Sequence, residues 1–383
     1  MSTRSPSHRI FLVAGEVSGD LHGADLAREL LALRPGLRLE GLGGPRMAAA
    51  GVALVEDSSG WGMIGWFEAA RHVRPFLRRL DALTTRILQD PPSLLVPIDF
   101  PGFNLALLKR LRGRVPAIYY VPPMVSVRRG RRAARVAALG VRLLAIFPFE
   151  VDAYRAAGAD AVFVGHPAVD HMRAAPPADV ARRRLELPPD GPVLGLLPGS
   201  RRQELSLLLP AMLEAGRRIR DTDRAVTCVL ALASPIFRGD VDAAVAATGV
   251  PVKITDGARE VMAASTVLLM ASGTATVEAM LRGVPMVVTY RGSWLSWLYV
   301  HLAVKTRWAS IPNILAQEGF VPELIQGRAT AGAMAAAVQE LLNTPAEREK
   351  MHQRLLDLAA VLGPPGAARR AAAEVLAAVG MST

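Results

Sequence analysis

The chain has 383 residues, which is too long for one ordinary hydrophobic core and suits two domains of similar size. Hydrophobic residues make up 51% and charged residues 21%, a composition that excludes a disordered chain. The net charge is +11, and all but four of the 45 basic residues are arginine. This charge reflects either an arginine-rich codon usage or a surface that attracts nucleic acid, anionic lipid or phosphorylated substrates.

Three further features narrow the class of protein. Aromatic residues make up only 5%, which disfavours the stacking platforms of a nucleic-acid-binding protein. The single cysteine, Cys228, excludes intrachain disulfides and CxxC metal sites. Residues Met1–Ile10 lack the pattern of a signal peptide, and no apolar stretch reaches the roughly 18 residues that span a bilayer. We therefore expect a cytoplasmic protein.

In the first half of the chain, short apolar runs alternate with helical patterns. Arg9–Ala14 is expected to form a strand, followed by a glycine-containing turn and a helix over Leu21–Leu33. The remaining expected strands are Ser93–Ile98, Ala117–Val121, Arg142–Phe147 and Ala161–Val164, with helices at Glu68–Leu88 and Leu105–Leu111. Strands that alternate with helices predict βαβ units and a mostly parallel sheet.

The same alternation restarts after a segment rich in Pro and Ala. Expected elements there are the strands Val193–Leu197, Val226–Ala231, Val252–Ile254, Val267–Met270 and Met286–Thr289 and the helix Gln203–Ile219. We expect an α/β fold with Rossmann-like domains at 1–166 and 192–343 that face each other across a cleft, and a linker at 167–191. Residues 344–383 are expected to form helices that return toward the first domain.

Two loops of the second half have the form of anion sites. Pro198-Gly199-Ser200-Arg201 follows a buried strand and precedes a helix, so its backbone N–H groups and Arg201 are suited to phosphate. Ser272-Gly273-Thr274-Ala275-Thr276 repeats this arrangement, and Glu278 follows where a carboxylate can accept from a ribose diol. Either loop alone is also consistent with a plain strand-to-helix turn. Neither is a Walker loop or contains GxGxxG, which favours a nucleotide-sugar enzyme over a nucleoside triphosphatase or a dinucleotide oxidoreductase.

The first half carries candidate residues for the opposite side of the expected cleft. The strand-loop-helix junction Ala14–Gly23 and the loop Gly41–Arg46 are expected to bind an acceptor, although structural turns alone could explain both. The acceptor-side candidates are Gly15, Glu16, Ser18, Gly19, Asp20, Gly44 and Arg46. Asp99 follows a predicted strand, where it would act as a general base or cap the next turn.

Two segments have the composition of a membrane-surface contact. Arg128–Arg135 holds five arginines in eight residues, and Trp294–Val300 is apolar and aromatic with basic neighbours. Such segments suit an anionic headgroup boundary, although a buried helix with solvated ends has the same pattern.

Taken in order, several motifs resemble the lipid-A-disaccharide synthase family, whose members are inverting glycosyltransferases with the GT-B architecture of two facing Rossmann-like domains. These motifs are Ala14–Asp20, Gly43–Met47, Met63–Gly65, Ile98–Asp99, Phe147–Glu150, Val164–Pro167, Pro198–Arg201, Ser272–Glu278, Pro312–Ala316 and Val321–Leu324. Each motif is weak by itself, but the ordered series covers most of the chain and is specific.

The resemblance implies a reaction and a set of roles. UDP-2,3-diacylglucosamine would donate its sugar to the 6-hydroxyl of 2,3-diacylglucosamine 1-phosphate, giving a β-1,6-linked disaccharide and UDP at the cytoplasmic face of the inner membrane. Arg201 would contact phosphate, Glu278 the ribose and Asn313 the donor, with Gly199, Ser200, Ser272, Gly273, Thr274 and Thr276 completing the donor site. Asp99 would be the base or an essential acceptor-side carboxylate, and neither a metal nor a cofactor is expected.

The sequence departs from the family pattern in two places. Gly102 stands where the family usually has a second aspartate, and 124–131 replaces a tryptophan-containing stretch. Both departures lie in the expected acceptor domain. A divergent nucleotide-sugar enzyme with another acceptor, or one like UDP-N-acetylglucosamine 2-epimerase, therefore remains an alternative.

Overall fold

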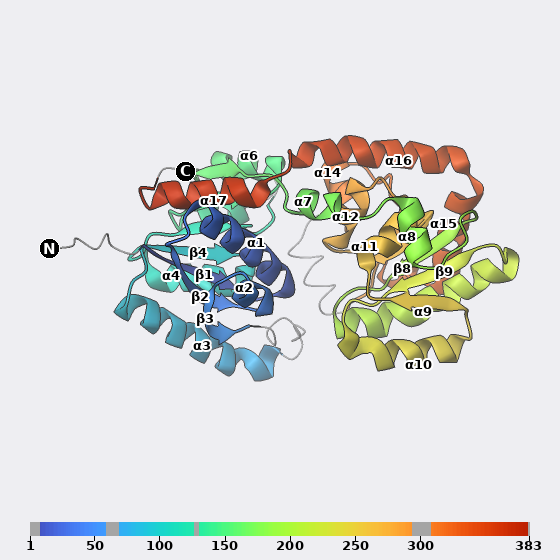
Figure 1. Ribbon diagram of the computed structural model, residues 1–383, viewed down its shortest axis with the longest axis horizontal. Coiled ribbons are helices and arrows are strands. Elements are labelled where there is room, and N and C mark those ends of the chain that lie inside the picture. Colours follow the sequence, from blue (N-terminus) through green and yellow to red (C-terminus); the bar gives the residue numbers. More distant parts are fainter. Residues whose placement is uncertain (1–7, 59–68, 126–129, 293–307, 382–383) are drawn as a thin grey trace. The chain divides into compact units, whose positions relative to one another are not determined.

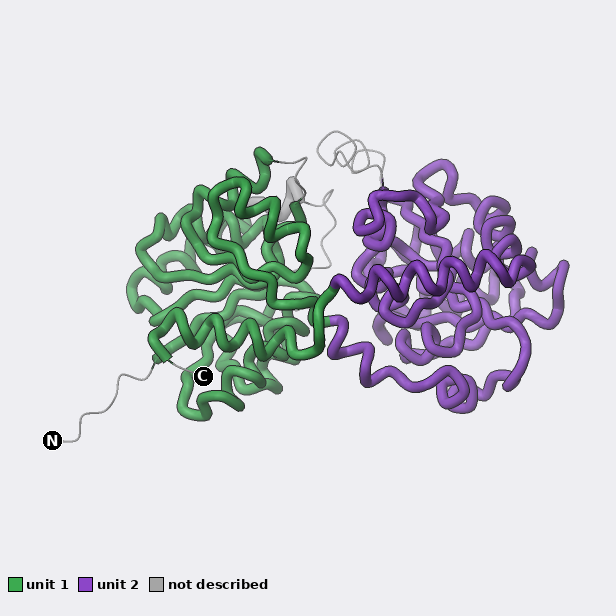
Figure 2. Tube along the Cα trace, turned by 90° about the horizontal axis from the view of Figure 1, so that it is seen from above, with its two compact units in different colours: residues 1–167, 362–383 green, residues 168–361 purple. Residues whose placement is uncertain are grey.

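The computed structural model describes residues 8–58, 69–125, 130–292 and 308–381. The chain forms two compact units, which are shown in separate colours in Figure 2. Unit 1 is Met1–Pro167 together with Leu362–Thr383, and unit 2 is Ala168–Val361. No helix within the described ranges is both long and apolar enough to cross a membrane.

Unit 1 is built on a parallel seven-stranded sheet in the order β3-β2-β1-β4-β5-β6-β7. Figure 1 labels β1, β2, β3 and β4 of this sheet. β1 occupies the predicted residues, and the other predicted strands are confirmed to within three residues at each end. The strands are β1 Arg9–Ala14, β2 Arg38–Gly43, β3 Ala53–Asp57, β4 Leu94–Ile98, β5 Ile118–Tyr120, β6 Arg142–Ala145 and β7 Ala161–Phe163. β1, β4 and β5 are almost wholly buried, which explains their continuous apolar sequences.

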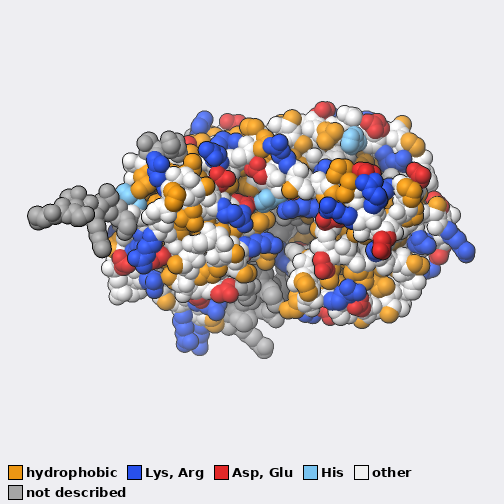
Figure 3. All heavy atoms as spheres, viewed as in Figure 1, with side chains coloured by type: hydrophobic (Ala, Val, Ile, Leu, Met, Phe, Trp, Pro, Cys, Tyr) orange, Lys and Arg blue, Asp and Glu red, His pale blue; other side chains and the backbone are white. Residues whose placement is uncertain are grey.

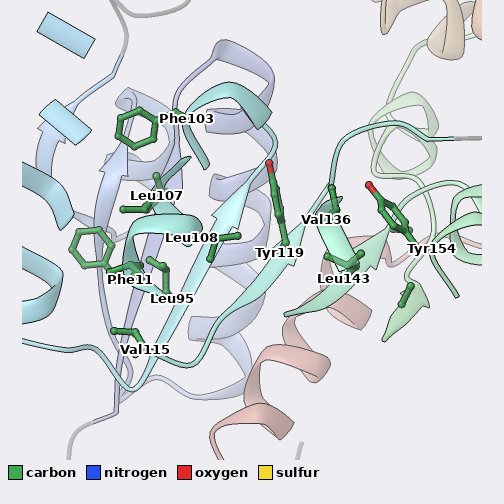
Figure 4. Packing of buried hydrophobic residues seen from close by; sticks show 14 of the residues in the cluster. Phe11, Leu95, Phe103, Leu107, Leu108, Val115, Tyr119, Val136, Leu143 and Tyr154 are labelled. Atoms are coloured by element: carbon green, nitrogen blue, oxygen red, sulfur yellow. The ribbon is translucent and has the colours of Figure 1, made fainter. Parts of the chain in front are cut away.

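Helices cover the sheet of unit 1. They are α1 Val17–Leu33, α2 Pro45–Ala49, α3 Ala69–Gln89, α4 Pro101–Leu111, α5 Gly130–Ala137, α6 Pro148–Ala156 and the C-terminal α17 Ala367–Ala378. α1 begins four residues earlier than predicted, because Val17–Gly19 are helical and Gly19 lets the helix approach Ala14 closely. Residues from the strands and from α3, α4 and α6 pack into one apolar cluster, shown in Figure 4.

Unit 2 repeats the parallel arrangement with six strands in the order β10-β9-β8-β11-β12-β13. These strands are β8 Val193–Leu197, β9 Thr227–Ala231, β10 Val252–Thr255, β11 Val267–Ala271, β12 Met286–Tyr290 and β13 Glu323–Ile325. The helices described for this unit are α7 Ala168–Arg173, α8 Ala178–Arg184, α9 Arg202–Thr222, α10 Arg238–Thr248, α11 Ala258–Ala264, α12 Ala275–Leu281, α14 Ile311–Ala316, α15 Ala331–Asn343 and α16 Pro345–Ala359.

The units divide the chain differently from the expected boundaries. The expected linker at 167–191 contains α7 and α8, whose buried faces pack on α12 and α11 of unit 2. The C-terminal helices are shared: α16 packs on α12 in unit 2, whereas α17 packs on α1 in unit 1. The return of the C-terminus to unit 1 thus begins at Leu362, after α16.

Each sheet has a position at which the strand order reverses. In unit 1, β2 and β4 flank β1, and in unit 2, β9 and β11 flank β8. Loops that leave the carboxyl ends of the strands at such a position form the binding site of open α/β sheets. In unit 1 these loops follow Ala14 and Ile98, and in unit 2 they follow Leu197 and Ala271.

Candidate active site

Asp99 is the first residue after β4, at the carboxyl edge of the unit 1 sheet. The Ser18 hydroxyl, from the first turn of α1, donates to Asp99 Oδ2 at 2.9 Å. These residues are 81 positions apart in sequence and meet because β1 and β4 are adjacent parallel strands. The structure thus brings together two of the predicted site residues, a carboxylate and a hydroxyl, at the strand-order reversal of unit 1.

The other predicted residues of the 14–20 loop surround this pair in different ways. Gly15 lies against the Phe100 ring, whose Cδ1 would be 2.1 Å from a Cβ built at that glycine. Glu16 is half-buried and is the N-cap residue of α1, and Gly19 is buried inside the helix. Gly15 therefore makes room for the residue that follows Asp99.

Asp20 joins α1 to α2. Its carboxylate accepts hydrogen bonds from the backbone N–H groups of Gly44 at 2.8 Å, Arg46 at 3.1 Å and Met47 at 3.0 Å. It thereby caps the amino end of α2, and a Cβ at Gly44 would approach its Cγ to 2.7 Å. Arg46 contributes only its backbone N–H to this cap, and its side chain is exposed. The hydrogen bonds of Asp20 thus give it a structural role at the junction of the two helices.

The first predicted phosphate loop, 198–201, leads into α9 and carries its own carboxylate. Gly199 has a φ of +108°, and a Cβ there would lie 2.3 Å from Glu204 Oε2. That oxygen accepts from the N–H groups of Ser200 at 3.0 Å and Arg201 at 3.3 Å, in a capping box. The Arg201 side chain is 60% exposed, and its Nη1 lies 3.7 Å from Glu204 Oε1. Glu204 therefore occupies two of the donors that were predicted to bind an anion.

The second predicted loop, 272–276, lies beside the first, because Met270 of β11 pairs with Leu197 of β8. The Ser272 hydroxyl donates to the carbonyl of Ala309 at 2.7 Å, and the buried Thr276 hydroxyl donates to the carbonyl of Gly273 at 2.7 Å. Gly273 and Thr274 are exposed at the start of α12. The exposed part of this loop is therefore Gly273–Thr274, with the flanking hydroxyls holding its shape.

Glu278 and Asn313 lie in different surroundings within unit 2. Glu278 is half-buried on α12, and burial raises the pKa of its carboxyl, whereas the charges of Arg259 and His171 lower it. Asn313 is fully buried: its amide donates to the Val321 carbonyl at 2.9 Å and to Glu323 Oε1 at 2.8 Å.

The Asn313 network extends to the backbone on both sides. The Asn313 side-chain carbonyl accepts from the N–H of Val321 at 3.0 Å, and Glu323 accepts from the N–H groups of Ala309 and Ser310. This cluster fixes the 308–313 segment, which in turn holds Ser272 through the Ala309 carbonyl. The hydrogen bonds of Asn313 thus connect it to the second loop through the protein backbone.

Two residues at this edge were not singled out in the sequence. Tyr290 ends β12, and burial, together with the charge of Glu204, raises the pKa of its hydroxyl, whereas Arg201 lowers it. Gln326 follows β13 with a φ of +53°, and its Oε1 accepts from the N–H of Gly292 at 3.1 Å. Both stand at the carboxyl end of a short strand, Tyr290 as its last residue and Gln326 directly after it.

Several of the predicted segments fall wholly or partly outside the described residues. Met63–Gly65, residues 126–129 and Trp294–Val300 lie outside the described residues, so the altered stretch at 124–131 is described only in part. Gly102 is exposed in the first turn of α4, and a Cβ there would meet no atom within 4 Å. Within the described ranges, no three His, Cys, Asp or Glu side chains are grouped so as to hold a metal ion.

Comparisons with known proteins agree with this architecture. Lipid-A-disaccharide synthase of Geobacter sulfurreducens is 40% identical over 380 residues, covering 99% of each chain. The structure resembles that of Neisseria meningitidis UDP-GlcNAc 2-epimerase bound to UDP-GlcNAc, with 11% identity, a TM-score of 0.62 and coverage of 92% of this chain and 97% of that one. It also resembles the calicheamicin glycosyltransferase CalG4, with 18% identity, a TM-score of 0.58 and coverage of 97% and 98%.

These two solved structures share the fold of two Rossmann-like domains, which confirms the predicted fold class. The family model described as lipid-A-disaccharide synthetase matches residues 10–374, nearly the whole chain, and the ordered motifs predicted this family. The chain belongs to the lipid-A-disaccharide synthase family of glycosyltransferases.

Proposed function

We propose that the protein transfers the sugar of UDP-2,3-diacylglucosamine to the 6-hydroxyl of 2,3-diacylglucosamine 1-phosphate with inversion at the anomeric carbon. The observation that carries this proposal is the match to the family over residues 10–374, together with a relative that is 40% identical over 99% of both chains. The products are UDP and a β-1,6-linked disaccharide.

On the donor side, the two adjacent loops of unit 2 receive the UDP group. Arg201 supports this role because its exposed guanidinium is a forked donor that suits diphosphate. The exposed Gly273–Thr274 backbone lies on the neighbouring strand end, and Glu278 is placed one turn further along α12 to accept from the ribose. Positive charge and N–H dipoles at this edge stabilise the departing UDP.

Asn313 contributes to this donor site through the loop that it supports. Its amide is engaged with Val321 and Glu323, so we assign it the shaping of the 308–313 segment, which carries the Ala309 carbonyl that holds Ser272. Gly199, Ser200 and Thr276 likewise set the form of their loops.

On the acceptor side, Asp99 acts as the general base. The 6-hydroxyl oxygen attacks the anomeric carbon, the bond from that carbon to the diphosphate oxygen breaks, and the hydroxyl proton passes to Asp99. Ser18 supports this role because its hydrogen bond to Oδ2 holds the carboxylate at the end of β4. A single displacement of this kind inverts the anomeric configuration.

We also propose that the protein works on an anionic membrane surface at the cytoplasmic face. The +11 charge supports this, and so does a surface depression of about 530 Å³ lined by Lys109, Arg110, Arg112 and Arg114. On the face shown in Figure 3, arginine and lysine side chains are distributed over both units. Co-sedimentation with vesicles that contain anionic lipid, but not with neutral vesicles, would support this placement.

The direct test of the reaction is incubation of the purified protein with both lipid substrates. Mass spectrometry should find the disaccharide phosphate, and nuclear magnetic resonance should show a β linkage formed from an α-linked donor. UDP binding without disaccharide would contradict the acceptor assignment. Turnover of unacylated UDP-N-acetylglucosamine would instead favour an activity like that of the 2-epimerase.

A further inference from the structure

The backbone at Asp99 has an unusual conformation. Asp99 and the following Phe100 have φ values of +49° and +48°, in the left-handed region that residues with a Cβ rarely adopt. Two such residues in succession are unfavourable unless the surrounding structure holds them. This turn begins at the residue whose carboxylate we propose as the base.

Two side chains hold the peptide that follows Asp99. The carbonyl oxygen of Asp99 accepts hydrogen bonds from the Tyr119 hydroxyl at 2.8 Å and from Asn104 Nδ2 at 2.7 Å. On its other side, the Asp99 N–H donates to the carbonyl of Tyr120 at 3.0 Å. The Asp99 backbone is therefore fixed by β5 and by the first turns of α4.

Both donors lie in the core of unit 1. Tyr119 and Asn104 are fully buried, and Asn104 Nδ2 also lies 3.3 Å from the carbonyl oxygens of Val13 and Ile98. Burial and the nearby charge of Asp99 raise the pKa of the Tyr119 hydroxyl well above its ordinary value. The hydroxyl therefore stays protonated, and remains a donor, to a higher pH than an ordinary tyrosine.

Orientation of the carboxylate depends on this turn. In the left-handed conformation, the Asp99 side chain reaches Ser18 Oγ at 2.9 Å. If the Asp99 carbonyl lost a donor, the turn could relax toward ordinary φ values, which would move the carboxylate relative to Ser18. Misplacement of a reacting group by about 1 Å can lower a rate by roughly two orders of magnitude.

We propose that Tyr119 and Asn104 are positioning residues, which lock the left-handed turn at Asp99 and thereby aim its carboxylate at the acceptor hydroxyl. This inference rests on the proposed role of Asp99 as the base. Neither residue contacts the reacting atoms, since both act on the backbone carbonyl.

The test is Tyr119→Phe, which removes one hydroxyl and keeps the ring. We expect kcat to fall roughly tenfold, while KM for both lipids and the Kd for UDP stay unchanged. The matched control is Tyr154→Phe. Tyr154 is equally buried in the same cluster and donates to the Pro123 carbonyl, but it comes from α6 (Figure 4). This control should lose similar stability and keep kcat.

Combination with Asp99→Asn separates the possible failures. If Tyr119 acts through Asp99, adding Tyr119→Phe to Asp99→Asn will not lower the residual rate further. Asn104→Ala, if it folds, should behave like Tyr119→Phe. If Tyr119→Phe has the wild-type kcat while Asp99→Asn is inactive, the positioning role is overturned and the base assignment stands. A wild-type kcat for Asp99→Asn would overturn the base assignment and the positioning role with it.

Discussion

The carboxylate of Glu204 accepts a hydrogen bond from the backbone N–H of Ser200 at 3.0 Å, inside the loop proposed to bind diphosphate. The same oxygen accepts from the Arg201 N–H at 3.3 Å. A negative charge of the protein thus lies on donors that are suited to a phosphate. Binding of UDP must either displace this carboxylate or place like charges close together.

Glu204→Gln should therefore tighten UDP binding. If water screens the two groups fully, removing one like charge about 4 Å from the ligand is worth about 1 kcal/mol, which corresponds to a roughly fivefold lower Kd. Calorimetric titration with UDP measures this change. Glu214→Gln, on the same helix but paired with Arg217 and Arg218, is the control and should leave the Kd unchanged. Equal or weaker binding by Glu204→Gln would show that the charge of Glu204 does not oppose UDP.

Gly15→Ala should lower stability. Its Cβ would lie 2.1 Å from Phe100 Cδ1, so the ring must move, at a cost of about 1–3 kcal/mol in the free energy of unfolding. Because Phe100 follows Asp99, kcat should fall as well. Urea unfolding and a rate assay measure the two effects. An unchanged unfolding midpoint would show that the Phe100 ring moves without cost.

Gly102→Asp should be tolerated and should stabilise the protein. The site is open, and an acidic residue in the first turn of α4 interacts favourably with the helix dipole, by about 0.3–1 kcal/mol. Thermal unfolding checks the stability. If Gly102 marks a changed acceptor, this variant will turn over 2,3-diacylglucosamine 1-phosphate faster than the wild type. Equal rates would show that the departure does not affect acceptor choice.

The stability of the protein should depend on pH through Glu278. Because burial raises the pKa of its carboxyl, the folded state holds this proton more tightly than the unfolded state. Ionisation of Glu278 therefore destabilises the fold, an effect that is absent below the unfolded pKa of about 4.3 and complete above the raised pKa. Glu278→Gln should be more stable than the wild type at neutral pH, by a margin that shrinks toward pH 4. Urea unfolding at several pH values measures this difference in stability. A difference that does not change with pH would contradict the role of Glu278.

Sequence patterns predicted the elements whose burial is continuous. β1 and β8 lie at the predicted residues because each is a run of buried apolar side chains. The edge strands β3 and β13 were not predicted, because acidic residues (Glu56 and Asp57 in β3, Glu323 in β13) interrupt their short apolar runs. The edge strand β7 is equally short and only partly buried, but it is wholly apolar and was predicted. The helical turn Val17–Gly19 was missed because glycine and serine usually mark loops, whereas close packing on Ala14 selects Gly19 here.

For the site, the sequence indicated positions but not hydrogen-bond partners. Asp99 could be singled out because it follows a strand. Its contacts with Ser18 and Tyr119 span 81 and 20 positions and depend on strand order. Likewise, nothing local indicated that Asp20 caps α2 across 24 positions. Such contacts depend on the tertiary fold and leave no periodic signal.

We propose that unit 2 binds UDP and that unit 1 supplies the base. Parallel UDP titrations of Asp99→Asn and Arg201→Ala test this division of roles most directly. We predict that Asp99→Asn binds UDP with the wild-type Kd, although its turnover falls by roughly 10²–10⁴-fold. Arg201→Ala should raise the Kd for UDP by about tenfold or more, because a charged hydrogen bond is lost. An equal loss of UDP binding in both variants would contradict this division of roles.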